Sequence, residues 1–280
     1  MRFHYFTVEI QVQRRRNMTP FVRIEKLMKI YGHSKSDKVA VLKNVSFSFE
    51  QGEIIGLIGA SGAGKSTIGK ILAGLEVPSK GQIFFENTEL TKLKPKERRR
   101  LAKDIAMIFQ DPYESLSPRM KIWQLIEEPL VILGLETNKE KRMQLVREAL
   151  RVVSLDPDKY LDRFPHELSG GERQRVGVAR AFVCKPRLII ADEPTSMLDT
   201  SLRLELVALL KQMNVDYGIS YVFITHDIAL TKGFCDRIIV LHQGEIADQG
   251  PTEDVIEHPT HPFTKSLIEA LLILETHEGA

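Results

Sequence analysis

The chain has 280 residues, 39 of them Lys or Arg and 37 Asp or Glu, for a formal net charge of +2. This near balance excludes a strong electrostatic pull toward nucleic acid, so we expect no nucleic-acid partner. No apolar run approaches the about 18 residues of a membrane-crossing helix, and two cysteines without C-x-x-C spacing indicate a reducing compartment.

The first residues lack the apolar core of a signal peptide. We interpret residues 1–20 as a poorly ordered N-terminal extension, with Met18 as the true start. The main domain is predicted over residues 21–262, and residues 263–280 are predicted to form a C-terminal helix and tail.

Three segments of the N-terminal part are rich in aromatic and β-branched residues, namely 22–30, 45–49 and 82–86. They predict short strands of an antiparallel sheet.

Residues 59–67 read Gly-Ala-Ser-Gly-Ala-Gly-Lys-Ser-Thr and match the phosphate-binding pattern G-x-x-x-x-G-K-[ST]. The apolar run 54–58 precedes them and a helical stretch at 67–75 follows, which is the context that the pattern requires. Lys65 would bring a catalytic positive charge to the outer phosphates, and Ser66 a hydroxyl to Mg²⁺. By itself the loop predicts a nucleoside triphosphate. The predicted contacts are Gly59, Ser61, Gly62, Ala63, Gly64, Lys65, Ser66 and Thr67.

The next segments predict a charged helix at 95–102, a strand at 105–109 that leads to Gln110, and a helical insertion at about 112–177. In the insertion, Asp156–Pro157 is predicted to end a helix whose apolar residues recur at helical spacing. Those residues are Met143, Val146, Leu150 and Val153.

Ser169 and Glu172 form an S-x-x-E capping box, so a helix should begin here and run toward Phe182. Gly170 and Gly171 would leave the first amides of that helix uncovered, which makes a site for an anion. A helix cap without any binding role is the alternative that the motif leaves open.

Two buried strands should end beside the phosphate loop, because ligands of open α/β sheets bind at the carboxyl ends of the strands. The run 188–191 ends in Asp192, placed to hold Mg²⁺ through water, and Glu193, placed to orient or deprotonate the attacking water. The run 221–224 leads to His226, which would reach the γ-phosphate. A solvated strand end and a structural histidine are the alternatives.

Strands that alternate with helices predict a mostly parallel sheet. Between the last two of these strands lies one apolar stripe, read as a core-facing side of a helix. The stripe consists of Leu202, Leu206, Leu209, Leu210 and Met213.

In order and spacing, these segments resemble the ATPase subunit of ATP-binding cassette (ABC) transporters over residues 22–262. The matching motifs are GASGAGKST (59–67), Gln110 in FQD, LSGGERQR (168–175), LIIADE (188–193), SMLD (196–199) and His226 in ITHD. The resemblance implies an α/β P-loop NTPase (RecA-like) fold. Its mostly parallel core would carry an antiparallel β subdomain and an inserted helical subdomain.

The resemblance also implies roles for single residues. Tyr31 would stack on the adenine of ATP, although an ordinary strand aromatic is the alternative. Gln110 would contact the nucleotide and its Mg²⁺. In a head-to-tail dimer, Ser169, Gly170 and Gly171 would complete the ATP site of the partner, and Asp199 would lie across the same interface.

Residues 109–119 (FQDPYESLSPR) are similar to the same segment of oligopeptide, dipeptide and nickel importers, and 258–264 (HPTHPFT) to their H-P-Y-T box, with Phe263 for tyrosine. This resemblance implies a peripheral subunit at the cytoplasmic face of the cell membrane that hydrolyses ATP to drive import of a peptide or nickel-type solute.

The implied partners are a second ABC ATPase subunit, two permease subunits and, indirectly, an extracytoplasmic solute-binding protein. Trp123 and Leu125 are candidate permease contacts, with a lobe core as the alternative. The alternative function is an ABC-type ATPase of a soluble complex such as phosphonate degradation. We read the two histidines of the tail box as part of a turn rather than a metal site, because acidic or thiol ligands are missing at ligand spacing.

Overall fold

The computed structural model describes residues 19–32, 37–111 and 116–278. The expectations for residues 1–18, including the start at Met18, lie outside these ranges. The strands are β1 (Val22–Tyr31), β2 (Val39–Phe49), β3 (Ile54–Gly59), β4 (Lys80–Phe85), β5 (Thr88–Glu89), β6 (Ile105–Ile108), β7 (Leu188–Asp192), β8 (Ser220–Thr225), β9 (Arg237–His242) and β10 (Glu245–Pro251). The helices are α2 (Lys65–Leu72), α3 (Pro95–Leu101), α5 (Ile122–Leu133), α6 (Lys139–Val152), α7 (Pro157–Tyr160), α8 (Gly170–Phe182), α9 (Thr200–Tyr217), α10 (Thr252–Glu257) and α11 (Pro262–Glu278), with 3₁₀ turns η1 (Leu90–Lys92), η2 (Pro165–Glu167) and η3 (Ala229–Thr231).

A six-stranded sheet in the order β10-β9-β3-β8-β7-β6 forms the centre of the molecule. Its strands run parallel except β10, which pairs antiparallel with β9. Side chains of a strand alternate between two faces, and here each face has its own core. In β3, Ile54 and Ile58 belong to one core and Ile55 and Leu57 to the other. Burial on both faces explains why β3, β7 and β8 read as continuous apolar runs.

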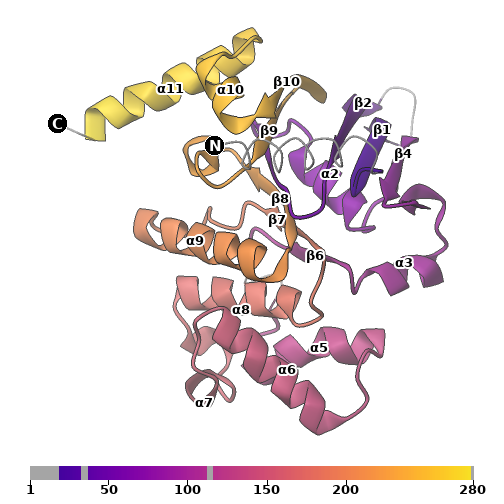
Figure 1. Ribbon diagram of the computed structural model, residues 1–280, viewed down its shortest axis with the longest axis vertical. Coiled ribbons are helices and arrows are strands. Elements are labelled where there is room, and N and C mark those ends of the chain that lie inside the picture. Colours follow the sequence, from indigo (N-terminus) through magenta and orange to yellow (C-terminus); the bar gives the residue numbers. More distant parts are fainter. Residues whose placement is uncertain (1–18, 33–36, 112–115, 279–280) are drawn as a thin grey trace, which may run out of the picture.

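The second sheet is antiparallel, with the order β2-β1-β4-β5, and packs with α2 in one of the two cores. It lies beside the central sheet in Figure 1. The predicted strand 45–49 is only the second half of β2. Asn44 adopts a φ of 60° at the middle of this strand, so the alternation of side chains is interrupted there.

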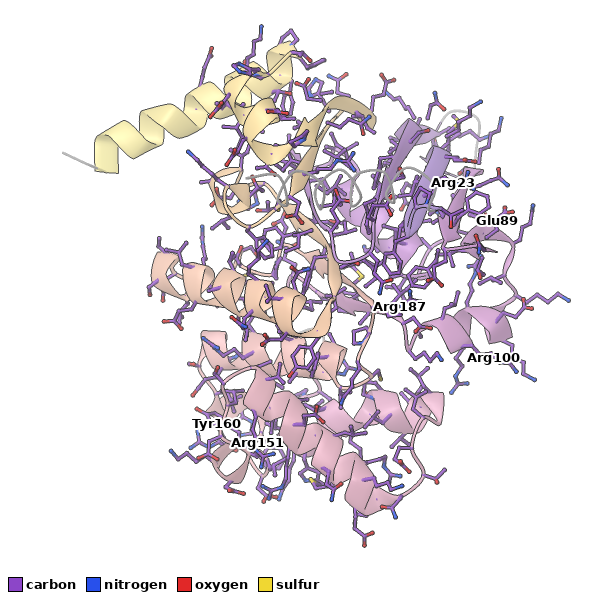
Figure 2. The ribbon with its side chains drawn as sticks, in the orientation of Figure 1. Arg23, Glu89, Arg100, Arg151, Tyr160 and Arg187 are labelled. Carbon is purple, nitrogen blue, oxygen red and sulfur yellow. The ribbon has the colours of Figure 1, made fainter. Side chains whose placement is uncertain are left out.

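Arg187, just before β7, ties the two sheets together (Figure 2). Its guanidinium donates to Glu86 at 2.5 Å and lies 5.1 Å from the ring centroid of Phe21. This hydrogen bond lowers the pKa of Glu86. Arg100 of α3, the charged helix predicted at 95–102, is exposed.

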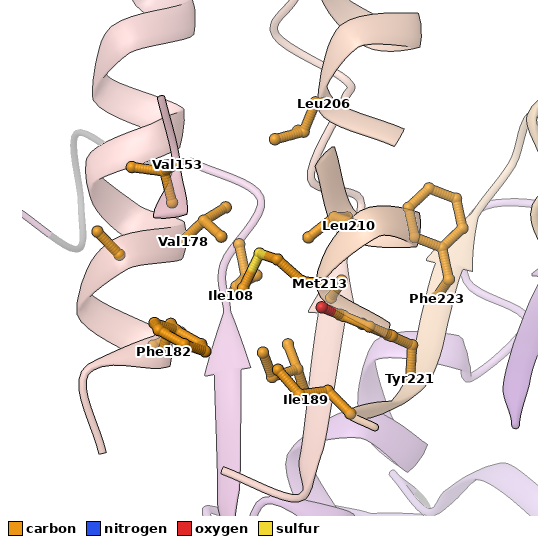
Figure 3. Close-up of a cluster of buried hydrophobic side chains, with 14 of the residues drawn as sticks. Ile108, Val153, Val178, Phe182, Ile189, Leu206, Leu210, Met213, Tyr221 and Phe223 are labelled. Atoms are coloured by element: carbon orange, nitrogen blue, oxygen red, sulfur yellow. The ribbon is translucent and has the colours of Figure 1, made fainter. Parts of the chain in front are cut away.

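Helices α5, α6 and α7 lie together at the end of the molecule opposite α11, and α8 packs between them and the sheet (Figure 1). Figure 3 shows the shared core, where Val153 and Phe182 face Leu210 and Met213 of α9 across the sheet residue Ile108. The apolar stripe predicted for α9 is therefore a core face.

Two predicted helix ends are wrong. Asp156–Pro157 does not end α6, which stops at Val152, because Ser154 has a φ of 60°. Asp156 instead caps α7 by accepting a hydrogen bond from the Asp158 N–H, and proline suits the first position of a helix. The helix predicted at 67–75 is α2, which begins two residues earlier and ends at Leu72. In the described ranges, no helix is both long and apolar enough to cross a membrane.

Candidate active site

A pocket lies where β3, β7 and β8 end, and residues from six separate segments meet in it. Most of the residues predicted to bind the phosphates, the metal ion and the adenine ring of ATP line this pocket. The pocket is lined by Tyr31, Val41, Ser61, Gly62, Gly64, Lys65, Ser66, Thr67, Gln110, Glu193 and His226.

The phosphate loop follows β3. At two of its glycines there is no room for a side chain. A Cβ on Gly59 would lie 2.3 Å from the Leu241 carbonyl oxygen, and one on Gly64 would lie 2.5 Å from a methyl group of Leu42. Gly64 also has a φ of 104°, which side chains other than hydrogen rarely allow. The loop can therefore close tightly around an anion with its backbone N–H groups.

Lys65 is held inside this loop. Its ammonium donates hydrogen bonds to the carbonyl oxygens of Gly59 at 2.7 Å and Ala60 at 3.0 Å, and the residue is 5% exposed. Burial lowers the pKa of Lys65, while the carboxylates of Asp192 and Glu193 act in the opposite direction. A phosphate in the loop would supply the anion that this buried cation needs.

Ser66 and Asp192 form the candidate metal site. The Ser66 hydroxyl donates to Asp192 Oδ1 at 2.8 Å, so the two oxygens are close enough to serve one ion. Burial raises the pKa of Asp192, although the bond from Ser66 opposes the shift. A hydroxyl and a carboxylate are the hard oxygen ligands that Mg²⁺ prefers, so the residues fit this ion.

Glu193 is the centre of a polar contact network at the mouth of the pocket. Its Oε2 accepts a hydrogen bond from Gln110 Nε2 at 3.2 Å and lies 3.3 Å from His226 Nδ1. The backbone N–H of Glu193 donates to Ile224 O at 2.9 Å, which fixes the residue against β8. Three side chains from three strand ends thus converge on the position where an attacking water would bind.

Tyr31 also lines the pocket and is 39% exposed. Its hydroxyl donates to Glu76 Oε2 at 2.5 Å, and the ammonium of Lys29 lies 4.7 Å from its ring centroid. The ring is thereby fixed at the pocket wall, as a stacking platform requires. Neither Glu76, which holds the ring, nor Val41, which lines the pocket, could be identified from the sequence, because neither belongs to a recognisable motif.

The predicted trans-acting residues lie elsewhere, because none of them lines this pocket. Ser169 caps α8 through the expected box, since its N–H donates to Glu172 Oε2 at 2.7 Å and its Oγ accepts from the Glu172 N–H at 3.3 Å. Gly170 has open space around it, while a Cβ on Gly171 would meet Leu202 at 3.2 Å. Asp199 is exposed and caps α9.

Residues of α5, α8 and β6 line a largely apolar groove. It is lined by Ala73, Leu75, Ala102, Ile105, Ala106, Met107, Ile108, Phe109, Glu128, Pro129, Ile132, Leu133, Gln174, Gly177, Arg180, Ala181 and Cys184. Leu125 is buried in the lobe core and Trp123 packs against that core, so neither lines the groove. The structure therefore favours a role of these two residues in the lobe core over a contact with the permease.

The tail histidines do not gather metal ligands. His261 Nδ1 accepts a hydrogen bond from the Phe263 N–H at 3.1 Å, as in an ordinary turn. Over the part of the chain that the structure describes, no three His, Cys, Asp or Glu side chains come together to hold a metal ion.

Comparisons with known proteins agree with this geometry. A family profile described as ABC transporter matches residues 42–196. The chain is similar to the oligopeptide transport ATP-binding protein OppF of Streptococcus mutans, with 42% identity over 91% of this chain and 82% of OppF. It is similar to the dipeptide transport ATP-binding protein DppF of Lactococcus lactis, with 40% identity over 89% of this chain and 80% of DppF.

Among solved structures, the chain is similar to the ATP-binding cassette MJ0796, a dimer in a post-hydrolysis state bound to ADP and Pi. The TM-score is 0.75 at 31% identity, and the alignment covers 82% of this chain and 98% of MJ0796. It is also similar to CbiO1 of Clostridium perfringens, part of the CbiONQ transporter complex, with a TM-score of 0.75, 28% identity and coverage of 85% and 91%.

Proposed function

The chain belongs to the ABC transporter family and is an ATP-binding cassette ATPase, and we propose that it drives peptide import through a membrane permease. The observation that carries the proposal is the convergence of Lys65, Glu193 and His226 in one pocket, combined with about 40% identity to relatives named for oligopeptide and dipeptide transport.

In the proposed reaction, the β- and γ-phosphates of ATP lie in the phosphate loop against Lys65. Glu193 accepts a proton from the attacking water, and His226, whose imidazole lies beside it, contacts the γ-phosphate. Gln110 holds Glu193 through the hydrogen bond that its side-chain amide donates, and therefore links the base to the segment that follows β6. The adenine stacks on Tyr31.

Mg²⁺ would be held by Ser66 and Asp192, with Gln110 as the third predicted ligand. When bound, the ion neutralises charge on the phosphate oxygens. The two ligands are already oriented toward each other, because the Ser66 hydroxyl donates a hydrogen bond to the carboxylate of Asp192.

The site is completed by a second ATPase subunit. Ser169 is exposed and Gly170 half-buried at the N-terminus of α8, and neither these two nor the buried Gly171 lines the pocket of their own chain. They would therefore grip the γ-phosphate bound by a partner. Asp199 would lie at the same interface. A dimeric arrangement is known for the similar cassette MJ0796.

The apolar groove between α5, α8 and β6 is the proposed contact with the permease. Ile132 and Leu75 on its walls are more than half exposed, and Phe109 in the groove directly precedes Gln110. An amphipathic helix in this groove would therefore press on the residue that contacts the base. This contact would place the protein at the cytoplasmic face of the membrane, without a span of its own in the described ranges.

Peptides are the proposed cargo class because the named relatives are peptide transporters, whereas a nickel solute has no such support. An extracytoplasmic solute-binding protein would select the peptide. The second candidate is the ATPase of a soluble complex such as phosphonate degradation, which shares the cassette but would need no permease.

The test is mass spectrometry of the proteins that copurify with the tagged chain, expressed from its native locus and extracted in mild detergent. We expect two multi-span permease subunits and a second ATPase. An Ile132→Glu variant should bind ATP normally but lose the permeases, because a charge would enter the apolar groove. Recovery of soluble enzymes alone would overturn the importer and favour the second candidate.

A further inference from the structure

The turn before α11 is fastened to the central sheet by a buried carboxylate. Asp248 of β10 accepts hydrogen bonds from the Thr260 hydroxyl and, at 3.0 Å, from the His261 N–H. Burial alone would raise the pKa of Asp248, but these hydrogen bonds outweigh it and hold the pKa below its ordinary value. The carboxylate is therefore charged at neutral pH, and charge-assisted hydrogen bonds hold the turn.

The same turn packs onto His242, the last residue of β9. The ring of Phe263 stacks on the His242 imidazole, with centroids 4.2 Å apart and planes at 26°. The His261 ring lies 5.8 Å from His242, centroid to centroid. The C-terminal segment thus contacts the very end of a strand that is the direct neighbour of β3.

His242 leads into the turn between β9 and β10, and residues on either side of His242 contact the walls of the nucleotide site: Leu241 of β9 meets the first residue of the phosphate loop, and Gly244 of the turn meets β2. Leu241 pairs with Gly59 of β3, and its carbonyl oxygen fills the place of the missing Cβ of that glycine. On the other side, a Cβ on Gly244 would lie 2.5 Å from the carbonyl oxygen of Val41, which lines the nucleotide pocket. A shift of this turn would therefore disturb its close contacts with β2, where the Lys43 N–H also donates to the Gly244 carbonyl oxygen at 2.8 Å, and the pairing of Leu241 with Gly59.

We propose that His242, Asp248 and Phe263 are positioning residues for ATP. By fixing the turn between β9 and β10, the C-terminal segment holds the phosphate loop and the Val41 wall in the arrangement that binds the nucleotide. The inference rests on ATP binding at the phosphate loop, and it adds that affinity for ATP depends on residues about 200 positions away in the sequence, none of which line the pocket.

The test is the Kd for ATP of the full-length chain, measured with a fluorescent ATP analogue in the absence of permease. Phe263→Ala removes the ring stack and should raise the Kd about 5-fold or more, the lower end of couplings between separate sites. Phe263→Tyr keeps the stack and should stay within about twofold of wild type. Glu269→Ala, at an exposed position of α11, controls for changes to that helix and should leave the Kd unchanged.

Thermal unfolding of the same proteins without nucleotide separates positioning from stability alone. If Phe263→Ala lowers the unfolding temperature but binds ATP with the wild-type Kd, the proposal is overturned. Should this variant not fold, Thr260→Val removes one hydrogen bond to Asp248 and is judged by the same Kd criterion. Lys65→Ala tests the premise independently: if it binds ATP like wild type, the phosphate-loop site itself is wrong, whatever Phe263 does.

Discussion

Glu193 has a φ of 45°, in the left-handed region that residues other than glycine rarely occupy. Hydrogen bonds on both sides hold it there, because its N–H donates to Ile224 O and its carbonyl accepts from the Ser196 hydroxyl at 3.1 Å. Such backbone strain costs on the order of 1–3 kcal/mol and tends to occur at functional sites. Here it aims the carboxylate at Gln110 and His226, the geometry expected of a positioned base.

Glu193→Gln should therefore separate binding from chemistry. The amide has nearly the same shape but cannot accept a proton, so we expect ATP affinity within a few-fold of wild type and turnover reduced about 10²–10⁴-fold. Phosphate release under saturating Mg²⁺–ATP measures the rate. Hydrolysis at the wild-type rate would show that another group is the base.

In the nucleotide-free protein, the buried carboxylate of Asp192 lowers the stability of the fold at neutral pH. Its pKa is raised in the folded state, so the folded protein holds this proton more tightly than the unfolded chain. Stability is consequently lost as pH rises from the ordinary carboxyl value of about 3.9 through the raised folded pKa. Asp192→Asn should unfold at a higher temperature than wild type at pH 7 and lose that advantage below about pH 4. Melting curves in EDTA across this pH range provide the check.

The same substitution should weaken Mg²⁺–ATP binding, since a charged ligand of the metal is lost. A variant that is less stable than wild type at pH 7 would contradict the assignment of burial as the dominant influence on Asp192.

Among the elements, α8 has an observed helix cap and a proposed anion site at the same N-terminus, which the sequence could not separate. Its N-terminus is closed by Ser169 and Glu172, and the Tyr160 hydroxyl donates a further hydrogen bond to Glu172. This bond is the first cause of the lowered pKa of Glu172. The helix is therefore well capped within its own chain, while the amides of Gly170 and Gly171 remain candidates for a partner's phosphate.

Ser169→Asp distinguishes a cap from an anion site. Aspartate caps helices about as well as serine, whereas alanine costs about 1 kcal/mol. We expect Ser169→Asp to unfold near the wild-type temperature but to fail in ATP-dependent dimerisation, because its carboxylate would repel the γ-phosphate. Compared with Ser169→Asp, Ser169→Ala should be less stable but should lose less of its ATP-dependent dimerisation. If both variants dimerise normally, α8 is capped and nothing more.

The sequence predicted those elements whose pattern is local. The loop at 59–67 and the capping box at Ser169 each carry their own signal, so the strand and helix around them followed. The helix end at Asp156–Pro157 was misjudged because the same dipeptide can close one helix or open the next. Contacts made by tertiary packing, such as Glu76 on Tyr31, leave no trace in a single sequence.

At the scale of the whole molecule, the two halves of the proposed reaction are on different surfaces. Lys65 and Glu193 line the pocket, while Ser169 and Asp199 do not. If these assignments hold, a chain on its own would contact ATP on one side only. Two chains arranged head to tail would enclose it, and hydrolysis would remove the affinity that holds the closed state.

Dimerisation should accordingly require ATP and its intact loop. The Glu193→Gln protein with Mg²⁺–ATP should double in mass by light scattering, alone or with the second cassette subunit that copurifies. Lys65→Ala under the same conditions should remain single, because it lacks the cation for the phosphates. A dimer of equal strength without nucleotide would argue against ATP as the closing ligand.

The order of strands in the central sheet has a consequence for how the protein is made. β3, which carries no polar side chain, pairs on its two sides with β8 and β9, which leave the ribosome more than 160 residues later. At about 5–20 residues per second, β3 waits roughly 10–40 s for its neighbours. During translation this segment exposes apolar side chains and unpaired backbone groups, which favour aggregation. We therefore expect a chaperone at the ribosomal exit to bind it.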